Sequence, residues 1–193
     1  FISAYESGRT LYYTPEGAFF VKHILIGLTD EQKKEITDLR ADDDEAVAAT
    51  ADAKREEYLL TIKEKADTVL GLVNDGGDFD ALMEEYGEDP GMKNENYKDG
   101  YLTYAGDTGF VAEFAKACEG LTADGMTTGL VGTDFGYHII RRVDTLPAGE
   151  AKFEDVKDAL MEAMLNDKKS QKYDEQVDAW ISEANVEIKS NKL

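Results

Sequence analysis

The stretch Thr133-Asp-Phe-Gly-Tyr-His-Ile-Ile-Arg-Arg-Val143 decides the fold, because it reads as a strand that follows a turn. Gly136 ends a loop, and apolar residues then alternate around His138. A second stretch, Phe19-Phe-Val-Lys-His-Ile-Leu-Ile-Gly27, has the same character and carries His23 among apolar residues. Such alternation predicts β-strands. We expect the two strands to be neighbours in one sheet, with the two imidazoles meeting over its centre.

The chain has no histidines other than these two. A single histidine in an apolar strand is most often a hydrogen-bonded core residue, and both could be of that kind. Their matching settings in an acid-rich chain favour a functional site. At the level of the residues alone, both interpretations stay open.

The charge of the chain limits its partners. The formal net charge is −20, which argues against nucleic acid, whose affinity comes mainly from Lys and Arg on phosphates. It also argues against an anionic membrane surface. Basic or unfolded polypeptides remain compatible, as does a plain solvated surface.

The cysteine count and the apolar pattern of the sequence bear on the cellular compartment. Cys118 is the single cysteine, so an intrachain disulfide is excluded. This fits a cytosolic protein, and equally a secreted one from an organism that uses few disulfides. The sequence contains no apolar run of about 20 residues, the length that spans a membrane. Because it opens on Phe1 rather than Met, we expect a signal or lipid anchor, if any, to lie outside it.

The remaining periodicity predicts helices between short strands. We expect a strand at 18–28, a helix from the capping pattern Thr29-Asp-Glu-Gln32 and an exposed acidic helical insertion at 41–57. A helix with an apolar stripe over 59–73 and a short helix at 79–86 should follow. We then expect a strand at 101–104, a helix at 110–118, a hairpin of 126–131 with 136–143, and a long helix after Gly149. An antiparallel sheet flanked by helices satisfies this order, so the fold class is α+β.

Covalent and metal chemistry have little support. The chain has no Gly-x-Ser-x-Gly motif, and Cys118 falls on the inward side of a predicted helix. His23, His138 and Asp89 could converge on a metal, but His-x-x-x-His and Cys-x-x-Cys spacings are absent. No glycine-rich phosphate loop is present. We therefore expect neither a metal nor another cofactor.

Several blocks between Val21 and Asp144 resemble the parvulin-type (PpiC or rotamase) peptidyl-prolyl isomerase domain. They are Val21-Lys-His-Ile-Leu25, Lys65-Ala-Asp-Thr-Val-Leu70, Gly77-Asp-Phe-Asp-Ala-Leu82, Tyr86-Gly-Glu-Asp-Pro-Gly91, Gly109-Phe-Val-Ala-Glu-Phe114 and Phe135-Gly-Tyr-His-Ile-Ile140. The resemblance implies an antiparallel sheet of about four strands flanked by helices. It also implies isomerisation of Xaa-Pro bonds without covalent chemistry.

The resemblance carries over a set of site residues. The matching catalytic positions are His23, Asp89, Thr133 and His138. The matching substrate-binding positions are Leu102, Phe110 and Phe114 in an apolar wall around the proline ring, with Phe135 at the rim.

The flanks resemble those of PrsA-type and SurA-type extracytoplasmic foldases. This implies an N-terminal remnant of a helical chaperone domain at 1–17, an isomerase domain at 18–145 with a helical insertion at about 30–64, and a C-terminal chaperone segment at 146–193. The expected partners are unfolded or secreted polypeptides that contain proline. We also expect a cell-surface or membrane-anchored location in a bacterium, with the membrane reached only through an anchor outside this chain. The C-terminal helix could form a homodimer.

Two stretches depart from the family pattern. The usual Gly-Asp-Leu-Gly-Trp-Phe reads Gly100-Tyr-Leu-Thr-Tyr-Ala105, and the proline usual before Glu-Phe is Ala112. These departures keep an alternative open, a parvulin-shaped chaperone or peptide-binding module with little isomerase activity.

Overall fold

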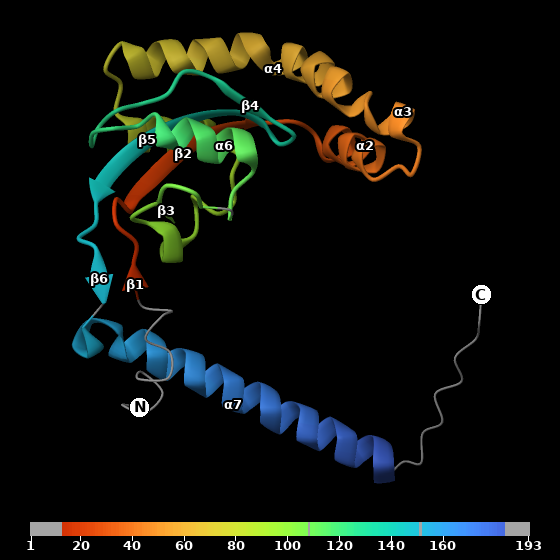
Figure 1. Ribbon diagram of the computed structural model, residues 1–193, viewed down its shortest axis with the longest axis vertical. Coiled ribbons are helices and arrows are strands. Elements are labelled where there is room, and N and C mark those ends of the chain that lie inside the picture. The colour runs from red at the N-terminus through yellow and green to blue at the C-terminus, as the bar shows by residue number, and fades with distance from the viewer. Residues whose placement is uncertain (1–12, 108, 151, 184–193) are drawn as a thin grey trace. The chain divides into compact units, whose positions relative to one another are not determined.

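The computed structural model describes residues 13–107, 109–150 and 152–183, which fall into two units (Figure 1). One unit is formed by residues 15–148. The other contains residues 13–14 and the described residues from 149 to 183.

The larger unit is built on a four-stranded antiparallel sheet. Its strands are β2 (Phe19–Gly27), β3 (Tyr101–Thr103), β4 (Val131–Thr133) and β5 (Gly136–Thr145), in the order β3-β2-β5-β4. This confirms the expected α+β class and the pairing of the two histidine-bearing strands. The predicted final hairpin begins later than expected, because only β4 forms a ladder with β5 while Thr127 makes a single bridge to Arg141.

The register of β2 on β5 places both histidines on one face. Leu25 pairs with His138, and His23 pairs with Ile140. Directly paired residues share a face, and residues two apart on one strand do so too. A β-bulge between Phe20 and Val21 shifts the pairing near the other end of β2.

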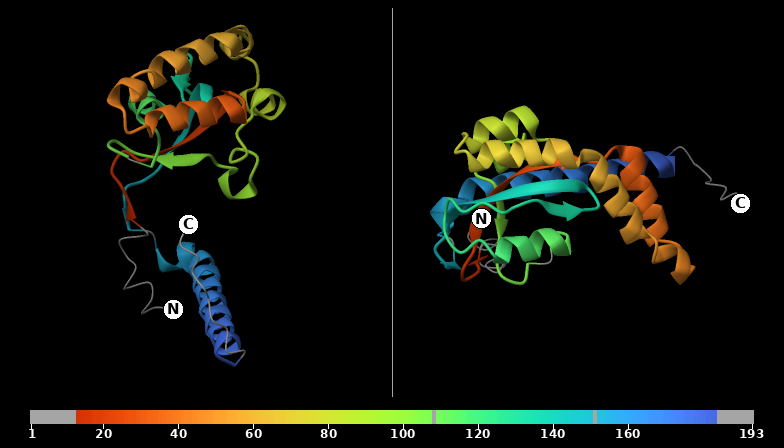
Figure 2. Two further views of the ribbon diagram at one scale, coloured as in Figure 1. Left: turned by 90° about the vertical axis from the view of Figure 1, so that its right-hand side faces the viewer. Right: turned by 90° about the horizontal axis from the view of Figure 1, so that it is seen from above.

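Helices cover the sheet on both faces. On one face, α4 (Ala51–Asn74) and α5 (Phe79–Tyr86) bury an apolar cluster that includes Ile24 and Ile139. On the other face, α6 (Ala112–Glu119) packs Phe114 against Val21 and Ile140. Figure 2 shows the sheet between α4 and α6. The histidines therefore lie on the α6 face.

The insertion after β2 folds as helices, as expected. It contains α2 (Asp30–Arg40), α3 (Glu45–Ala48) and the first turns of α4. The Thr29 capping box that begins α2 is confirmed, since Thr29 Oγ1 accepts from Gln32 N–H and the Gln32 side chain accepts from Thr29 N–H. Of residues 41–57, which were expected to be exposed, only Ala51 is fully buried. Ile36 of α2, which precedes that stretch, is also fully buried.

Between α5 and β3 the chain forms a long loop that includes the short 3-10 helix η2 (Glu95–Tyr97). Asp78 caps α5 by accepting from Ala81 N–H.

The smaller unit contains the strand pair β1 (Tyr13–Thr14) and β6 (Gly149–Glu150), followed by the predicted long helix α7 (Phe153–Glu183). Tyr173 and Trp180 of α7 are exposed. The first twelve residues of the predicted N-terminal remnant lie outside the described residues. Within the described ranges, no helix combines the length and apolarity needed to cross a membrane.

Gly136→Ala is expected to destabilise the larger unit strongly. Gly136 has φ 139°, and an added Cβ would come within 2.1 Å of the Ile26 carbonyl oxygen. The substitution causes both backbone strain and a clash at the β2–β5 ladder. We therefore expect the free energy of unfolding, measured in urea, to fall by roughly 3 kcal/mol. Gly125→Ala is the control, because Gly125 also has positive φ but open space around its Cβ position. Equal losses for the two variants would contradict this account of the ladder end.

Candidate active site

The centre of the site is a contact between two buried imidazoles. His23 of β2 and His138 of β5 approach with Nδ1 to Nδ1 at 3.0 Å, and their rings stack with centroids 5.1 Å apart. The two residues are 4% and 5% exposed. The strand pairing thus brings together residues that are 115 positions apart in sequence.

A chain of hydrogen bonds runs through this pair. His23 Nε2 lies 2.7 Å from Asp89 Oδ2, and His138 Nε2 lies 2.8 Å from Thr133 Oγ1. Tyr101 donates its hydroxyl to the same Asp89 oxygen at 2.8 Å, while Gly91 N–H donates to Oδ1 at 3.0 Å. The order from one end to the other is therefore carboxylate, imidazole, imidazole, hydroxyl.

Burial and hydrogen bonding act on Asp89 in opposite directions. Partial burial favours the neutral acid, but hydrogen bonds from His23, Tyr101 and Gly91 N–H outweigh it and hold the pKa of Asp89 well below its usual range. Burial and the bond to Asp89 also raise the pKa of Tyr101. Asp89 is therefore a fixed anion that can only accept hydrogen bonds.

His138 is held in its neutral form. Burial lowers the pKa of His138 to about 3, and the neighbouring His23 acts in the same direction while Asp89 opposes it. A neutral imidazole has one donor nitrogen and one acceptor nitrogen. The single ring proton of His138 therefore lies either on Nδ1, which faces His23, or on Nε2, which faces Thr133.

Two proton arrangements satisfy every partner. If His23 is neutral, its Nε2–H donates to Asp89, His138 Nδ1–H donates to His23, and the Thr133 hydroxyl donates to His138. If His23 carries a second proton, the inner bonds reverse, and the Thr133 hydroxyl turns toward the Gly136 carbonyl, 3.4 Å away. One proton gained at His23 thus reorients the chain as far as Thr133.

Above this chain lies an open pocket of about 670 Å³. This volume is in the usual range for small-molecule and peptide-side-chain sites. Its lining residues are His23, Leu25, Asp30, Lys33, Glu88, Asp89, Pro90, Tyr101, Gly109, Phe110, Val111, Phe114, Phe135 and His138.

Aromatic rings form the apolar part of the pocket. Phe114 is 3% exposed and meets both imidazoles edge-on, with centroids 5.3 Å from each. Phe110 stacks on Phe114 at 5.0 Å and lies 5.9 Å from Tyr101. The hollow can accept a small apolar ring, with the polar chain beneath it.

The structure brings together seven of the eight residues expected at the site. Six line the pocket, and Thr133 lies behind His138. The expectation for Leu102 is wrong: Leu102 pairs with Phe20 and is 41% exposed, on the sheet face opposite the pocket. Its neighbour Tyr101 pairs with Val21 and takes the place in the wall.

The register of β3 on β2 would have identified Tyr101, because it places Tyr101 opposite Val21. The tyrosine is also held closely by the loop, because a Cβ on Gly91 would lie 1.7 Å from its hydroxyl oxygen. Gly91 thus leaves the space that lets Tyr101 reach Asp89. Lys33 and Glu88 are among the other lining residues that were not expected from sequence.

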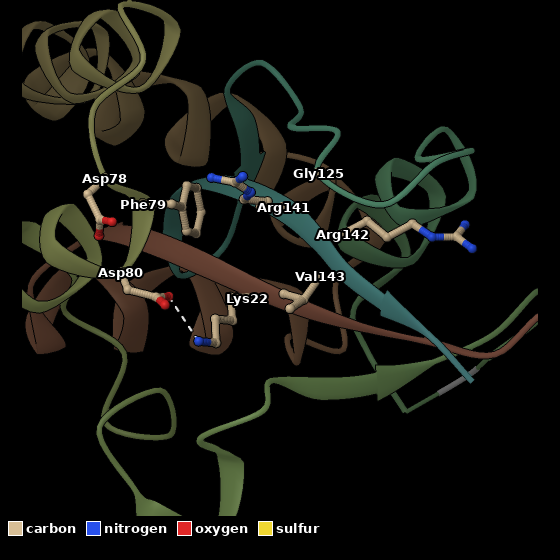
Figure 3. A pocket seen from close by; sticks show the side chains of 8 residues that line it. All are labelled: Lys22, Asp78, Phe79, Asp80, Gly125, Arg141, Arg142 and Val143. Atoms are coloured by element: carbon tan, nitrogen blue, oxygen red, sulfur yellow. Dashed lines mark hydrogen bonds and ion pairs between the residues drawn. The ribbon is translucent and has the colours of Figure 1, made fainter. Parts of the chain in front are cut away.

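A second, smaller hollow of about 260 Å³ lies on the α5 face of the sheet (Figure 3). Lys22 pairs there with Asp80 at 2.9 Å, and the guanidinium of Arg141 lies 5.6 Å from the centroid of Phe79. None of the expected site residues lines it. In neither hollow, nor elsewhere among the described residues, do three or more His, Cys, Asp or Glu side chains form a cluster that could hold a metal.

The site and fold match a known class of domain. The sequence model of the PPIC-type PPIase domain family covers residues 13–145, so the chain belongs to that family. Foldase protein PrsA of Geobacillus kaustophilus is 33% identical over 141 residues, which are 72% of this chain and 48% of that protein. Foldase protein PrsA of Clostridium tetani is 26% identical over 174 residues, 84% of this chain and 50% of the relative. The chain therefore spans about half the length of these two relatives.

Among solved structures, PrsA from Bacillus subtilis aligns with 98% of this chain and 57% of its own, at 20% identity and a TM-score of 0.41.

The buried neutral His138 predicts a loss of stability in mild acid. Its pKa is about 3 in the folded chain against an ordinary value of 6.5, so the unfolded chain binds more protons between these values. The free energy of unfolding should therefore fall, by roughly 1 kcal/mol per pH unit, as the pH drops below about 6.5. Urea unfolding at pH 7 and pH 5, for wild type and His138→Gln, measures this difference. An NMR titration in which His138 gains its proton near pH 6.5 would contradict it.

Proposed function

We propose that this chain isomerises Xaa-Pro peptide bonds in unfolded or secreted polypeptides. The observation that carries the proposal is the open aromatic hollow directly above the chain of Asp89, His23, His138 and Thr133. Family membership and the similarity to foldases over most of the chain support it.

The reaction needs no covalent step. Rotation about the peptide bond crosses a barrier of roughly 18–20 kcal/mol, because amide resonance is lost in the twisted state. The protein must bind the twisted amide better than either planar form. The twisted amide carries less charge on its oxygen, so a site that excludes water disfavours it less than bulk water does.

In this proposal the aromatic wall binds the proline ring. Phe110, Phe114 and Tyr101 surround the hollow, and Phe135, 47% exposed, lies at its mouth. Contact with the ring leaves the preceding carbonyl free to rotate. The wall thereby holds one side of the bond while the other side turns.

The polar chain below acts through a fixed charge. Asp89 is ionised, and its three donors prevent it from turning away. A fixed carboxylate near the rotating carbonyl repels the electron-rich oxygen of the planar amide more than that of the twisted amide. Of the histidine chain, His23 contacts this charge directly, while His138 and Thr133 fix the orientation of the His23 imidazole.

The domain arrangement follows as part of the same proposal. Residues 18–145 would be the isomerase domain with the helical insertion at about 30–64, and 146–193 would belong to a chaperone domain together with 1–17. The separation of residues 15–148 as one compact unit supports this division. The extracytoplasmic location, the anchor outside this chain and a homodimer through α7 remain parts of the proposal.

A second candidate function is peptide binding with little catalysis. Exposed aromatic side chains near the long loop and β3 favour it, since Tyr97 and Tyr104 are 44% and 37% exposed and Phe135 adds a third. Such surfaces bind unfolded segments without needing the histidine chain.

Tyr101→Phe tests the catalytic proposal. Loss of one hydroxyl frees Asp89 to turn, so we expect kcat/KM on a proline tetrapeptide to fall about tenfold, the usual cost of a hydrogen bond to a charged group. Tyr97→Phe is the matched control, because Tyr97 packs edge-on against Tyr101 at 4.9 Å and is largely exposed. A protease-coupled assay measures the rate, and suppression of aggregation of an unfolded client measures binding. Normal suppression with no wild-type acceleration of isomerisation would favour the second candidate.

The acidic segment that carries Asp89 predicts a substrate preference. The segment 78–99 contains eight Asp and Glu residues against Lys93 and Lys98. We expect peptides with Lys or Arg before proline to be turned over roughly threefold faster than those with Glu at low salt, and the ratio to approach one as salt screens the field. A peptide series that varies only this residue, assayed at two salt concentrations, measures it. Equal turnover at low salt would refute the preference.

A further inference from the structure

Two arginines of the insertion lie beside the walls of the pocket. Arg40 is the last residue of α2, and Arg55 lies in the first turns of α4. Both side chains point toward acidic residues of other elements, Asp134 in the turn between β4 and β5 and Glu113 in the first turn of α6.

The contact between Arg40 and Asp134 is bidentate. Arg40 Nε donates to Asp134 Oδ2 at 2.7 Å and Nη2 donates to Oδ1 at 2.9 Å. Nη2 also donates to Asp52 at the start of α4, at 2.7 Å. Paired bonds of this kind restrict geometry more than a single ion pair does. The turn is therefore held to both α2 and α4.

Arg55 connects the two walls. Its Nη1 donates to Glu113 Oε1 at 2.8 Å and lies 3.9 Å from Asp134 Oδ1. The Arg55 side chain is only 16% exposed, so solvent screens these contacts less than it would on an open surface. One cation thus holds carboxylates from α6 and from the β4–β5 turn near each other.

Each of these carboxylates is adjacent in sequence to site residues. Asp134 lies between Thr133, which contacts His138, and Phe135 at the mouth. Glu113 precedes Phe114, which contacts both imidazoles. Apolar packing adds to the connection, because Leu59 of α4 lies so close to Gly132 of β4 that an added Cβ would approach it to 2.8 Å.

We propose that Arg40 and Arg55 are positioning residues that set the width of the pocket mouth between Phe135 and α6. This inference rests on the proposed function, since it assigns to the insertion a role in substrate binding at the same site. Without the two cations, Asp134 and Glu113 would repel each other and the walls would separate.

The test compares Arg55→Met with Arg141→Met. Arg141 is also a partly buried arginine, but it lies over Phe79 on the opposite face of the sheet (Figure 3). Arg55→Lys keeps the charge and Asp134→Asn removes the shared acceptor, so both test the same contact with smaller changes in volume. NMR exchange spectroscopy on a proline peptide gives affinity and isomerisation rate separately, and the signals of Phe135 and His138 report the wall and floor.

We expect Arg55→Met to weaken peptide affinity roughly threefold to tenfold and to shift the Phe135 signal, with the rate in the bound state little changed. A wider mouth removes contacts made by planar and twisted forms alike, so KM rises while kcat holds. Arg55→Lys should recover part of the affinity, and Arg141→Met should behave as wild type. Asp134→Asn should reproduce part of the loss, because it removes the arginine contacts but also the repulsion from Glu113.

Wild-type affinity and an unshifted Phe135 signal in folded Arg55→Met and Asp134→Asn would overturn the positioning role. If Arg55→Met does not fold by thermal melting, Arg55→Lys and Asp134→Asn decide the question by the same two readouts. A wild-type protein that binds peptide without isomerising it would contradict the proposed function, while affinity would still decide the role of the arginines.

Discussion

The pairing of β2 with β5 is the constraint on which the site depends. A shift of one residue would turn His138 from the α6 face toward α4, and the contact with His23 would be lost. The apolar residues on both faces resist such a shift, because Ile24 and Ile139 would have to exchange places with residues of the opposite cluster. Gly136 adds a fixed end point, since its backbone approaches Ile26 more closely than any side chain would allow. The polar site is therefore held by apolar packing.

The floor and the walls of the pocket are held by different forces. The floor belongs to the sheet, where strand pairing and two apolar clusters fix the histidines. The walls come from α6, the β4–β5 turn and the start of α2, which contribute Phe114, Phe135 and Lys33. Ion pairs and a backbone hydrogen bond from Leu28 N–H to the Phe135 carbonyl oxygen connect these elements. Such contacts are weaker than core packing, so the mouth is the part of the site best able to adjust to different peptides.

Periodicity predicted the parts of the site that lie on long, regular elements, whereas Asp89, Phe110 and Phe135, which lie in loops and turns, were expected only from the family resemblance. The alternation of β2 and β5 predicted their pairing and the meeting of His23 with His138, and the cap at Thr29 was visible as a local pattern. The prediction for Leu102 was wrong because β3 has only three residues. Alternation over so short a strand does not show which side chain faces inward. The face of the sheet on which Leu102 lies is set by the pairing of β3 with β2, next to the β-bulge. The contact of Arg40 with Asp134 spans 94 residues, and no local pattern connects them.

One partly buried carboxylate fixes the first hydrogen bond of the polar chain, and the neutral form of His23 then sets the direction of the rest. Asp89 is ionised and accepts only, so the nitrogen of His23 that faces it must carry a proton. With His23 neutral, its other nitrogen accepts, which determines the proton position on His138 and then the direction of the Thr133 hydroxyl. A neutral side chain at position 89 could donate as well as accept, and the chain could then point either way. In a chain of net charge −20, this one negative charge orients three other side chains because it is the acidic group enclosed by donors beneath the pocket.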